Sequence, residues 1–329
     1  MRVLVTGAAG FVGAHLVAAL ERRGHETVAV DCFTSFHPRD LKERRWSTLT
    51  GKSSNDVLNI DVCDVEATSN PRLAVPFDAV VHLAAQSGVR YSERHPETCV
   101  RSNVLGTYSV LALASRLDVP RVIYASSSSV YGDTSGECRE EDLSVAPTSL
   151  YGVTKRSGEL IARAFWERQG LRSVGVRLFT SYGDWGRPDM AYFRMIVAAL
   201  TGTEFPLLAD LSVRRDFTYI ADTINVLVAL VEREGDFPDP ATLVNVGGGA
   251  PCSLQALKDV VQEITGRELR MRQQPPTLGD VTSTCASTQR MTELSLPIPT
   301  TSIAEGISQV VEWITPLISD ARDWVAQSE

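Results

Sequence analysis

The chain has 329 residues, of which 43% are hydrophobic and 22% are charged, and its formal net charge is −8 at pH 7. This is the composition of an ordinary globular protein that is long enough to bury a large core, and its negative charge gives no general basic surface for nucleic acid. No apolar run is long enough to cross a bilayer, and the chain enters its first strand without the apolar region of a signal peptide. Six scattered cysteines, without CxxC spacing or a nearby His cluster, indicate reduced thiols and no metal site. We therefore expect a cytoplasmic protein that binds neither a membrane nor nucleic acid.

The first 31 residues contain the parts of a dinucleotide site. A short apolar strand at residues 3–5 leads into the turn GAAGFVG, an amphipathic helix follows, and a second strand at residues 27–30 ends at Asp31. Glycines let the backbone approach a diphosphate, and the N-terminus of the helix supplies N–H groups and a positive dipole. The Asp31 carboxylate can bind ribose hydroxyls and repels a 2′-phosphate, which favours NAD over NADP. A glycine turn that only packs a helix on a strand is the alternative. The cofactor contacts predicted here are Gly7, Gly10, Phe11, Val12, Gly13 and Asp31.

Strands and helices alternate through the rest of the first half, which predicts a doubly wound parallel sheet covered on both faces. Strands are expected at residues 57–60, 77–85, 119–125 and 173–179, and helices at 96–117 and 151–169. The ends of the first two of these strands supply further expected NAD contacts: Asp61, Val62, Leu83, Ala84 and Ala85. His82 is interpreted as a core residue, and the charged run at residues 39–45 as a solvated helix or loop.

Tyr151 and Lys155 are the strongest candidates for catalysis. Residues four apart on a helix share a face, so the Lys155 ammonium is expected beside the Tyr151 phenol. The lysine, together with the positive nicotinamide ring, would lower the pKa of the phenol so that it can accept a proton from a sugar hydroxyl. Four serines end the strand before this helix, and Ser127 or a neighbour can bond the reacting oxygen.

The whole pattern resembles the extended short-chain dehydrogenase/reductases of the nucleotide-sugar epimerase/dehydratase family. The matching segments are TGAAGFVG, HLAAQSGVR, SSSSVYG, YGVTK, RLFTSYGDWGRPDM and RRDFTYIAD. The resemblance implies that Tyr151 is the base, that Lys155 is its partner and that Ser127 orients the sugar 4-oxygen. It also implies nucleotide contacts from Arg215, Arg272 and Asp280.

The subgroup that the chain resembles most is the UDP-glucuronate 4-epimerases, through the segment at residues 177–190. This segment places Thr180 and Arg187 beside Ser127, Ser128 and Ser129, and hydroxyls with one guanidinium suit a carboxylate. The alternative is that Arg187 pairs with Asp184 or Asp189 on a loop surface.

Other reactions of the family have less support in the sequence. The related 4,6-dehydratases carry Asp-Glu at the positions of Ser128 and Ser129, and UDP-glucuronate decarboxylases commonly carry Glu at the second of them. Two alternatives remain: a decarboxylase or dehydratase that acts on a related UDP- or dTDP-sugar, and a non-catalytic NAD-binding sensor. The sensor reading does not explain why Tyr151 and Lys155 occur together.

The expected organisation is an α/β protein with two lobes. Residues 1–179 form the NAD-binding domain and residues 180–329 a smaller mixed lobe for the nucleotide sugar, with residues 217–248 folding back onto the first lobe by the family resemblance. The resemblance also implies a homodimer through the helices at 96–117 and 151–169. Ala162, Phe165 and Trp166 are the apolar residues expected at this interface.

Overall fold

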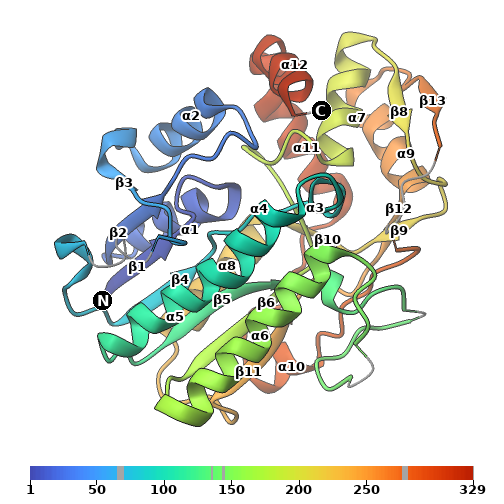
Figure 1. Cartoon of the computed structure of the whole chain (residues 1–329). Helices are drawn as coiled ribbons and strands as arrows, with labels where there is room; N and C mark the ends of the chain where they lie inside the picture. The colour runs from blue at the N-terminus through green and yellow to red at the C-terminus, as the bar shows by residue number, and fades with distance from the viewer. Residues whose placement is uncertain (65–69, 135, 143–144, 276–280, 329) are drawn as a thin grey trace.

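In the part of the chain that the structure describes, seven parallel strands form the central sheet (Figure 1). The computed structural model describes residues 1–64, 70–134, 136–142, 145–275 and 281–328. The strand order is β11-β6-β5-β4-β1-β2-β3, so the direction in which strands are added reverses between β1 and β4. The doubly wound sheet is confirmed, and ligands bind such sheets at the carboxyl ends of the strands near this reversal. The strands are β1 Arg2–Thr6, β2 Glu26–Asp31, β3 Leu58–Asn59, β4 Ala79–His82, β5 Val122–Ser127, β6 Ser173–Leu178 and β11 Ala241–Val246.

Helices cover both faces of the sheet because successive strand residues point to opposite sides. Val3 and Val5 belong to one apolar core, whereas Leu4 belongs to another. The first core is covered by α1 Phe11–Arg22, α2 Arg39–Thr50 and α8 Ile220–Glu232. The second is covered by the helices in front in Figure 1, α5 Gly106–Arg116 and α6 Leu150–Gln169. No helix among the described ranges is long and apolar enough to span a membrane.

The helix expected at residues 96–117 contains an irregular turn. It consists of α4 Pro96–Val100, a π-helical turn at Arg101–Leu105 and α5. Helical spacing predicts Val100, Tyr108 and Leu111 on one apolar face of this helix, but Val100 and Tyr108 are 44% and 50% exposed while Leu111 is buried. A π turn adds a residue to the helical repeat and so rotates the face that follows.

The prediction that Ala162, Phe165 and Trp166 lie at a dimer interface is also wrong in part. Ala162 and Phe165 lie in the core between α6 and the sheet, and Trp166 stacks under the Arg172 guanidinium. Helical spacing does not tell a core face from an interface face. The large exposed apolar side chains of α6 are instead Val153 and Leu160.

The second half of the chain forms a smaller mixed region and also returns to the first. Residues 217–248 contribute β11, which pairs with β6, and α8, which packs against α1. The division into lobes at residue 179 stays a prediction. The remaining strands form three pairs: β7 Thr180–Tyr182 with β10 Phe217–Tyr219, β9 Arg214–Arg215 with β12 Cys252–Ser253, and β8 Phe205–Leu207 with β13 Met271–Gln273. The remaining α-helices are α3 Val89–Arg94, α7 Ala191–Thr201, α9 Leu254–Thr265, α10 Gln289–Glu293, α11 Ile303–Ile314 and α12 Ile318–Gln327.

The structure confirms the interpretation of His82 but not that of the charged run at residues 39–45. His82 is a core residue, as predicted, because its ring is buried between Thr6 and Thr107. The charged run at residues 39–45 does form a helix, α2, but it is not fully solvated, since Lys42 and Arg45 are buried. Long cationic side chains extend from a surface helix into the interior here, which a run of charges cannot reveal.

Candidate active site

A cavity of about 1000 Å³ lies at the carboxyl ends of the central strands, where the doubly wound sheet predicts a ligand site. It extends from the glycine turn after β1 to β8 and β13 of the smaller region. Asp280 lies outside the described residues. The other predicted site residues all line this cavity: Gly7, Gly10, Phe11, Val12, Gly13, Asp31, Asp61, Val62, Leu83, Ala84, Ala85, Ser127, Ser128, Ser129, Tyr151, Lys155, Thr180, Arg187, Arg215 and Arg272.

The glycine turn is shaped for a diphosphate. Gly7 has φ of +71°, and a Cβ on Gly13 would lie 2.1 Å from the Gly7 carbonyl oxygen, so neither position accepts another residue without movement. Gly10 is the N-cap of α1 and has no side chain to occupy the free N–H groups of the first turn. These features fit the phosphates of a dinucleotide at a helix N-terminus.

Two carboxylates lie at the end of the cavity expected for the adenosine. Asp31 accepts hydrogen bonds from the backbone N–H groups of Ala9 (3.1 Å) and Phe33 (2.8 Å), which fix its orientation at the end of β2. Asp61 accepts from the backbone N–H of Cys63 at 2.9 Å and pairs with Arg101 at 2.8 Å. Both carboxylates are therefore oriented by the protein and line the cavity together.

Tyr151 and Lys155 come from the start of α6. Ser149 caps this helix through the backbone N–H of Gly152, and a Cβ on Gly152 would lie 2.4 Å from the Ser129 carbonyl oxygen. The glycine that follows Tyr151 thus lets α6 approach the serine segment closely. Lys155 Nζ donates to the Ala125 carbonyl at 2.9 Å and lies 6.0 Å from the centre of the Tyr151 ring.

The protein alone does not produce the low phenol pKa that the sequence predicts. Burial raises the pKa of Tyr151 above its ordinary value, and it is the Arg187 charge and a hydrogen bond with Ser127 that oppose this. Burial also lowers the pKa of Lys155 to about 8. The Arg187 charge therefore also favours the phenolate, a contribution that the sequence did not indicate.

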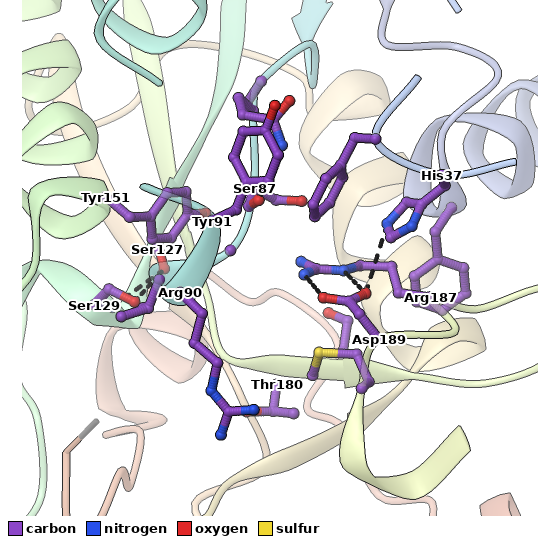
Figure 2. Close-up of a pocket in the computed structure, with 18 of the residues that line it drawn as sticks. His37, Ser87, Arg90, Tyr91, Ser127, Ser129, Tyr151, Thr180, Arg187 and Asp189 are labelled. Atoms are coloured by element: carbon purple, nitrogen blue, oxygen red, sulfur yellow. Dashed lines mark hydrogen bonds and ion pairs between the residues drawn. The ribbon is translucent and has the colours of Figure 1, made fainter. Parts of the chain in front are cut away.

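Arg187 points into the cavity and makes a bidentate ion pair with Asp189 (Figure 2). Its Nε and Nη2 donate to the two carboxylate oxygens at 3.0 and 2.6 Å, and both side chains are 23% exposed. Asp184 instead lies near His15 and Tyr219. The sequence left open whether Arg187 pairs with Asp184 or Asp189 on a loop surface. Arg187 does pair with Asp189, but this ion pair lies in the cavity wall.

The groups around Arg187 and Asp189 keep the Asp189 carboxyl ionised. Burial raises the pKa of the Asp189 carboxyl, but the charge and hydrogen bonds of Arg187 outweigh burial, so that the pKa lies below its usual range. His37 Nε2 is 3.6 Å from Asp189, and burial lowers the pKa of His37 to about 3. The pair is thus an ionised carboxylate and guanidinium beside a neutral imidazole.

Ser127 and Ser129 lie beside Tyr151, and Thr180 lies further along the cavity wall (Figure 2). Ser127 Oγ donates to Ser129 Oγ at 3.2 Å and accepts from the backbone N–H of Ser129. The acids among the described lining residues are Asp31, Asp61, Asp189 and Glu204. Asp189 is labelled in Figure 2, and its carboxylate is paired with Arg187.

Several lining residues are absent from the sequence-based prediction: His37, Arg90, Tyr91 and Asp189. Figure 2 shows Arg90 extending to the vicinity of Thr180, from the helix that follows β4. Arg90 is the last residue of the segment HLAAQSGVR and Tyr91 follows it, so the position of that motif at a strand end is the signal that could have found them. His37 carries no such signal, because it follows β2 in an irregular segment.

Arg215 and Arg272 lie at the far end of the cavity, away from Asp31. Arg215 ends β9, and its Nη1 donates to the Arg214 carbonyl at 2.9 Å. Arg272 lies on β13, is well exposed and approaches Glu204 at 3.9 Å. Two guanidinium groups at this end fit the diphosphate of a second nucleotide.

Comparisons with known proteins agree with this arrangement. The model of the NAD dependent epimerase/dehydratase family matches residues 3–247. A probable UDP-glucuronate 4-epimerase of Rhizobium meliloti is 34% identical over 95% of this chain and 96% of its own length. The UDP-glucuronic acid 4-epimerase from Bacillus cereus, solved with UDP-glucuronic acid and NAD, is 32% identical with a TM-score of 0.89, over 96% of this chain and 100% of that one. The UDP-glucose 4-epimerase from Thermotoga maritima, solved with UDP-glucose, is 25% identical with a TM-score of 0.84, over 97% of this chain and 100% of that one.

The sequence match, the sheet order and the glycine turn point to the same conclusion. The chain belongs to the NAD dependent epimerase/dehydratase family, and its cofactor is NAD.

Proposed function

We propose that the protein is a UDP-glucuronate 4-epimerase. The observation that carries the proposal is the position of Arg187, a largely buried guanidinium in the same cavity wall as Tyr151 and the serine segment. A cation that can make bidentate contacts suits a substrate with a carboxylate. The hydroxyls of Ser128, Ser129 and Thr180 supply further donors for such a group.

In the proposed reaction Tyr151 takes the proton of the sugar 4-hydroxyl, and Ser127 holds the 4-oxygen by a hydrogen bond. Bound NAD supplies the redox chemistry, since it accepts the hydride of C4 and returns it. The sugar turns between these two transfers, so that hydride returns to its opposite face and C4 is inverted. Lys155, held by the Ala125 carbonyl, keeps a positive charge beside the phenol.

The hold on the carboxylate decides between two outcomes. A 4-keto glucuronate is a β-keto acid, and it loses CO2 when the bond from C5 to the carboxylate lies parallel to the carbonyl π orbitals. Arg187 and Thr180 are the residues that we propose to keep this bond out of that alignment. Epimerisation then prevails over decarboxylation.

The alternative activities within the family are a decarboxylase or a dehydratase. A dehydratase needs an acid or base near C5 and C6 of the sugar, and among the described residues that line the cavity Asp189 is paired with Arg187. A decarboxylase needs the bond from C5 to the carboxylate to align with the 4-keto group, and Arg187 and Thr180 are the residues that we propose to prevent this. A non-catalytic NAD-binding protein has no need for Tyr151, Lys155 and Ser127 in one cavity. The relatives named UDP-glucuronate 4-epimerase further support the first proposal.

The test is a comparison of nucleotide sugars. Purified protein is incubated with UDP-glucuronate, UDP-glucose and dTDP-glucose, and kcat/KM is measured for each by product analysis. The proposal predicts that UDP-glucuronate is preferred by at least 30-fold, the lower bound for a charge-assisted bidentate contact of about 2 kcal/mol. Preference for a neutral hexose would contradict it.

We further propose that residues 1–179 with 217–248 bind NAD, that the remaining residues bind the nucleotide sugar, and that the protein is a homodimer. Exposed apolar side chains gather on the helices of one face of the sheet: Val100, Leu105, Tyr108, Val153 and Leu160. Among the described residues, the other large exposed apolar side chains are only Met1 and Ile298. A second copy of the chain is the expected partner of this surface.

A further inference from the structure

Arg45 is a buried cation on α2 that the proposed reaction does not use. Its side chain is 1% exposed, and its three nitrogens donate to backbone carbonyls: Nε to Trp185 at 2.7 Å, Nη1 to Ala9 at 3.1 Å and Nη2 to Gly186 at 3.4 Å. Burial lowers the pKa of Arg45 to about 10, so the group is still charged at neutral pH. No carboxylate in the described part of the chain lies within ion-pair distance of it, and a buried charge without a counter-charge is unfavourable.

The carbonyls that hold Arg45 belong to two different loops. Ala9 lies in the glycine turn, and its backbone N–H donates to Asp31. Trp185 and Gly186 come directly before Arg187 in the chain. Trp185 has φ of +56°, an unusual conformation for a residue with a side chain, and its ring packs against Trp313. One guanidinium therefore links the turn that faces the cofactor to the loop that presents Arg187.

We propose that Arg45 is a positioning residue that couples NAD binding to the carboxylate-binding loop. The diphosphate of NAD brings negative charge to the glycine turn and so compensates the buried cation, which lines the same cavity. When the positive charge of Arg45 is balanced in this way, its hydrogen bonds hold the carbonyls of Trp185 and Gly186 more firmly. Arg187, the next residue, is then fixed in the orientation that contacts the substrate. The coupling to NAD stands by itself, while the consequence for the substrate rests on the proposed function.

The planar fork of arginine is essential to this role. Its nitrogens diverge in one plane and reach carbonyls of two loops at once, whereas a lysine ammonium is a compact charge at the end of a single stem. Arg45→Lys therefore keeps the charge and breaks the link, and Arg45→Gln removes both. Arg44 offers a matched control, because it is the preceding residue of α2, pairs with Asp320 at 2.9 Å and donates to neither loop.

The test uses the NAD-free protein and its complex with NAD. Hydrogen exchange by mass spectrometry is followed at residues 7–13 and 185–190, and NAD affinity is measured by calorimetry. In the unmodified protein NAD slows exchange in both segments. In Arg45→Gln and Arg45→Lys we expect NAD to bind roughly 10-fold more weakly or worse, as for the loss of one charge-assisted hydrogen bond, and to protect residues 7–13 only. Arg44→Gln behaves as the unmodified protein.

Several results would overturn the coupling. It fails if NAD leaves exchange at residues 185–190 unchanged in the unmodified protein, and this measurement decides the matter even if the Arg45 variants do not fold. It also fails if the folded variants retain NAD-dependent protection of that loop.

A kinetic arm tests the consequence for the substrate. Arg45→Lys should lower kcat/KM for UDP-glucuronate at least 10-fold more than kcat/KM for UDP-glucose. An equal loss for both sugars would indicate a merely structural role and contradict the inference. If the unmodified protein ignores UDP-glucuronate, the proposed function fails, whereas the exchange result still decides whether Arg45 couples the two loops.

Discussion

Arg187→Met removes the guanidinium that we propose to bind the substrate carboxylate while it keeps most of the aliphatic stem. The lost contact is charge-assisted and bidentate, and such contacts contribute about 2–5 kcal/mol. This corresponds to a fall in kcat/KM for UDP-glucuronate of roughly 30-fold to 5,000-fold. Turnover of UDP-glucose should fall less, because it loses only the effect of the Arg187 charge on the Tyr151 phenol and not the carboxylate contact. The share of decarboxylated product should rise, because the carboxylate is free to rotate into alignment with the 4-keto group.

The same substitution also leaves Asp189 without its partner. Breaking a buried ion pair costs about 3–5 kcal/mol, and since these side chains are 23% exposed we expect about 2–3 kcal/mol of lost stability. The double variant Arg187→Met with Asp189→Asn removes both charges and should recover most of this stability. Chemical denaturation measures the stability, and mass spectrometry with NMR measures the products. If the double variant also recovers turnover of UDP-glucuronate, or if Arg187→Met lowers both sugars equally, Arg187 does not bind the carboxylate.

Four further outcomes are expected. Tyr151→Phe abolishes both epimerisation and decarboxylation, because neither begins without removal of the 4-hydroxyl proton; turnover measured over hours checks this, and any retained product of either kind refutes the role of the base. NAD binds at least 10-fold more tightly than NADP in calorimetry, since Asp31 repels a 2′-phosphate, and equal affinities would remove this interpretation. The protein is a dimer by light scattering at micromolar concentration, and Leu160→Glu converts it to a monomer without unfolding it; a monomeric unmodified protein contradicts the proposed interface. His82 has a pKa of about 3 in the folded protein and 6.5 ordinarily; the unfolded chain therefore binds more protons between these values, and the free energy of unfolding falls as the pH drops below 6.5, by up to about 1.4 kcal/mol per pH unit, a slope that should be smaller in His82→Gln.

Local sequence patterns predict the frame of the molecule well. The strand, glycine turn, helix and second strand of residues 2–31 form where their spacing places them, because apolar alternation and glycine freedom act over a few residues. Parallel strands then bring their carboxyl ends to one edge, which is why separate motifs line one cavity.

The sequence does not predict contacts between segments that lie far apart along the chain. Nothing local distinguishes Arg45, which reaches two loops, from its exposed neighbour Arg44, because burial of a long side chain depends on what packs above the helix. The sequence offers two aspartates, Asp184 and Asp189, as partners for Arg187, and only the fold of the loop determines that Asp189 is the partner. The core positions of Ala162 and Phe165 depend on the packing of α6 against the sheet, which the helical period of the sequence leaves undetermined.

The claim that the substrate is UDP-glucuronate and that the reaction inverts C4 can be tested by one time course. The unmodified protein with NAD is incubated with UDP-glucuronate, and proton NMR follows the sugar signals while mass spectrometry follows the mass. The account predicts a second uronate of unchanged mass that differs in configuration at C4, approached to equilibrium from either epimer. A product lighter by CO2 as the main species, or no reaction with UDP-glucuronate while a neutral UDP-hexose is converted, would contradict it.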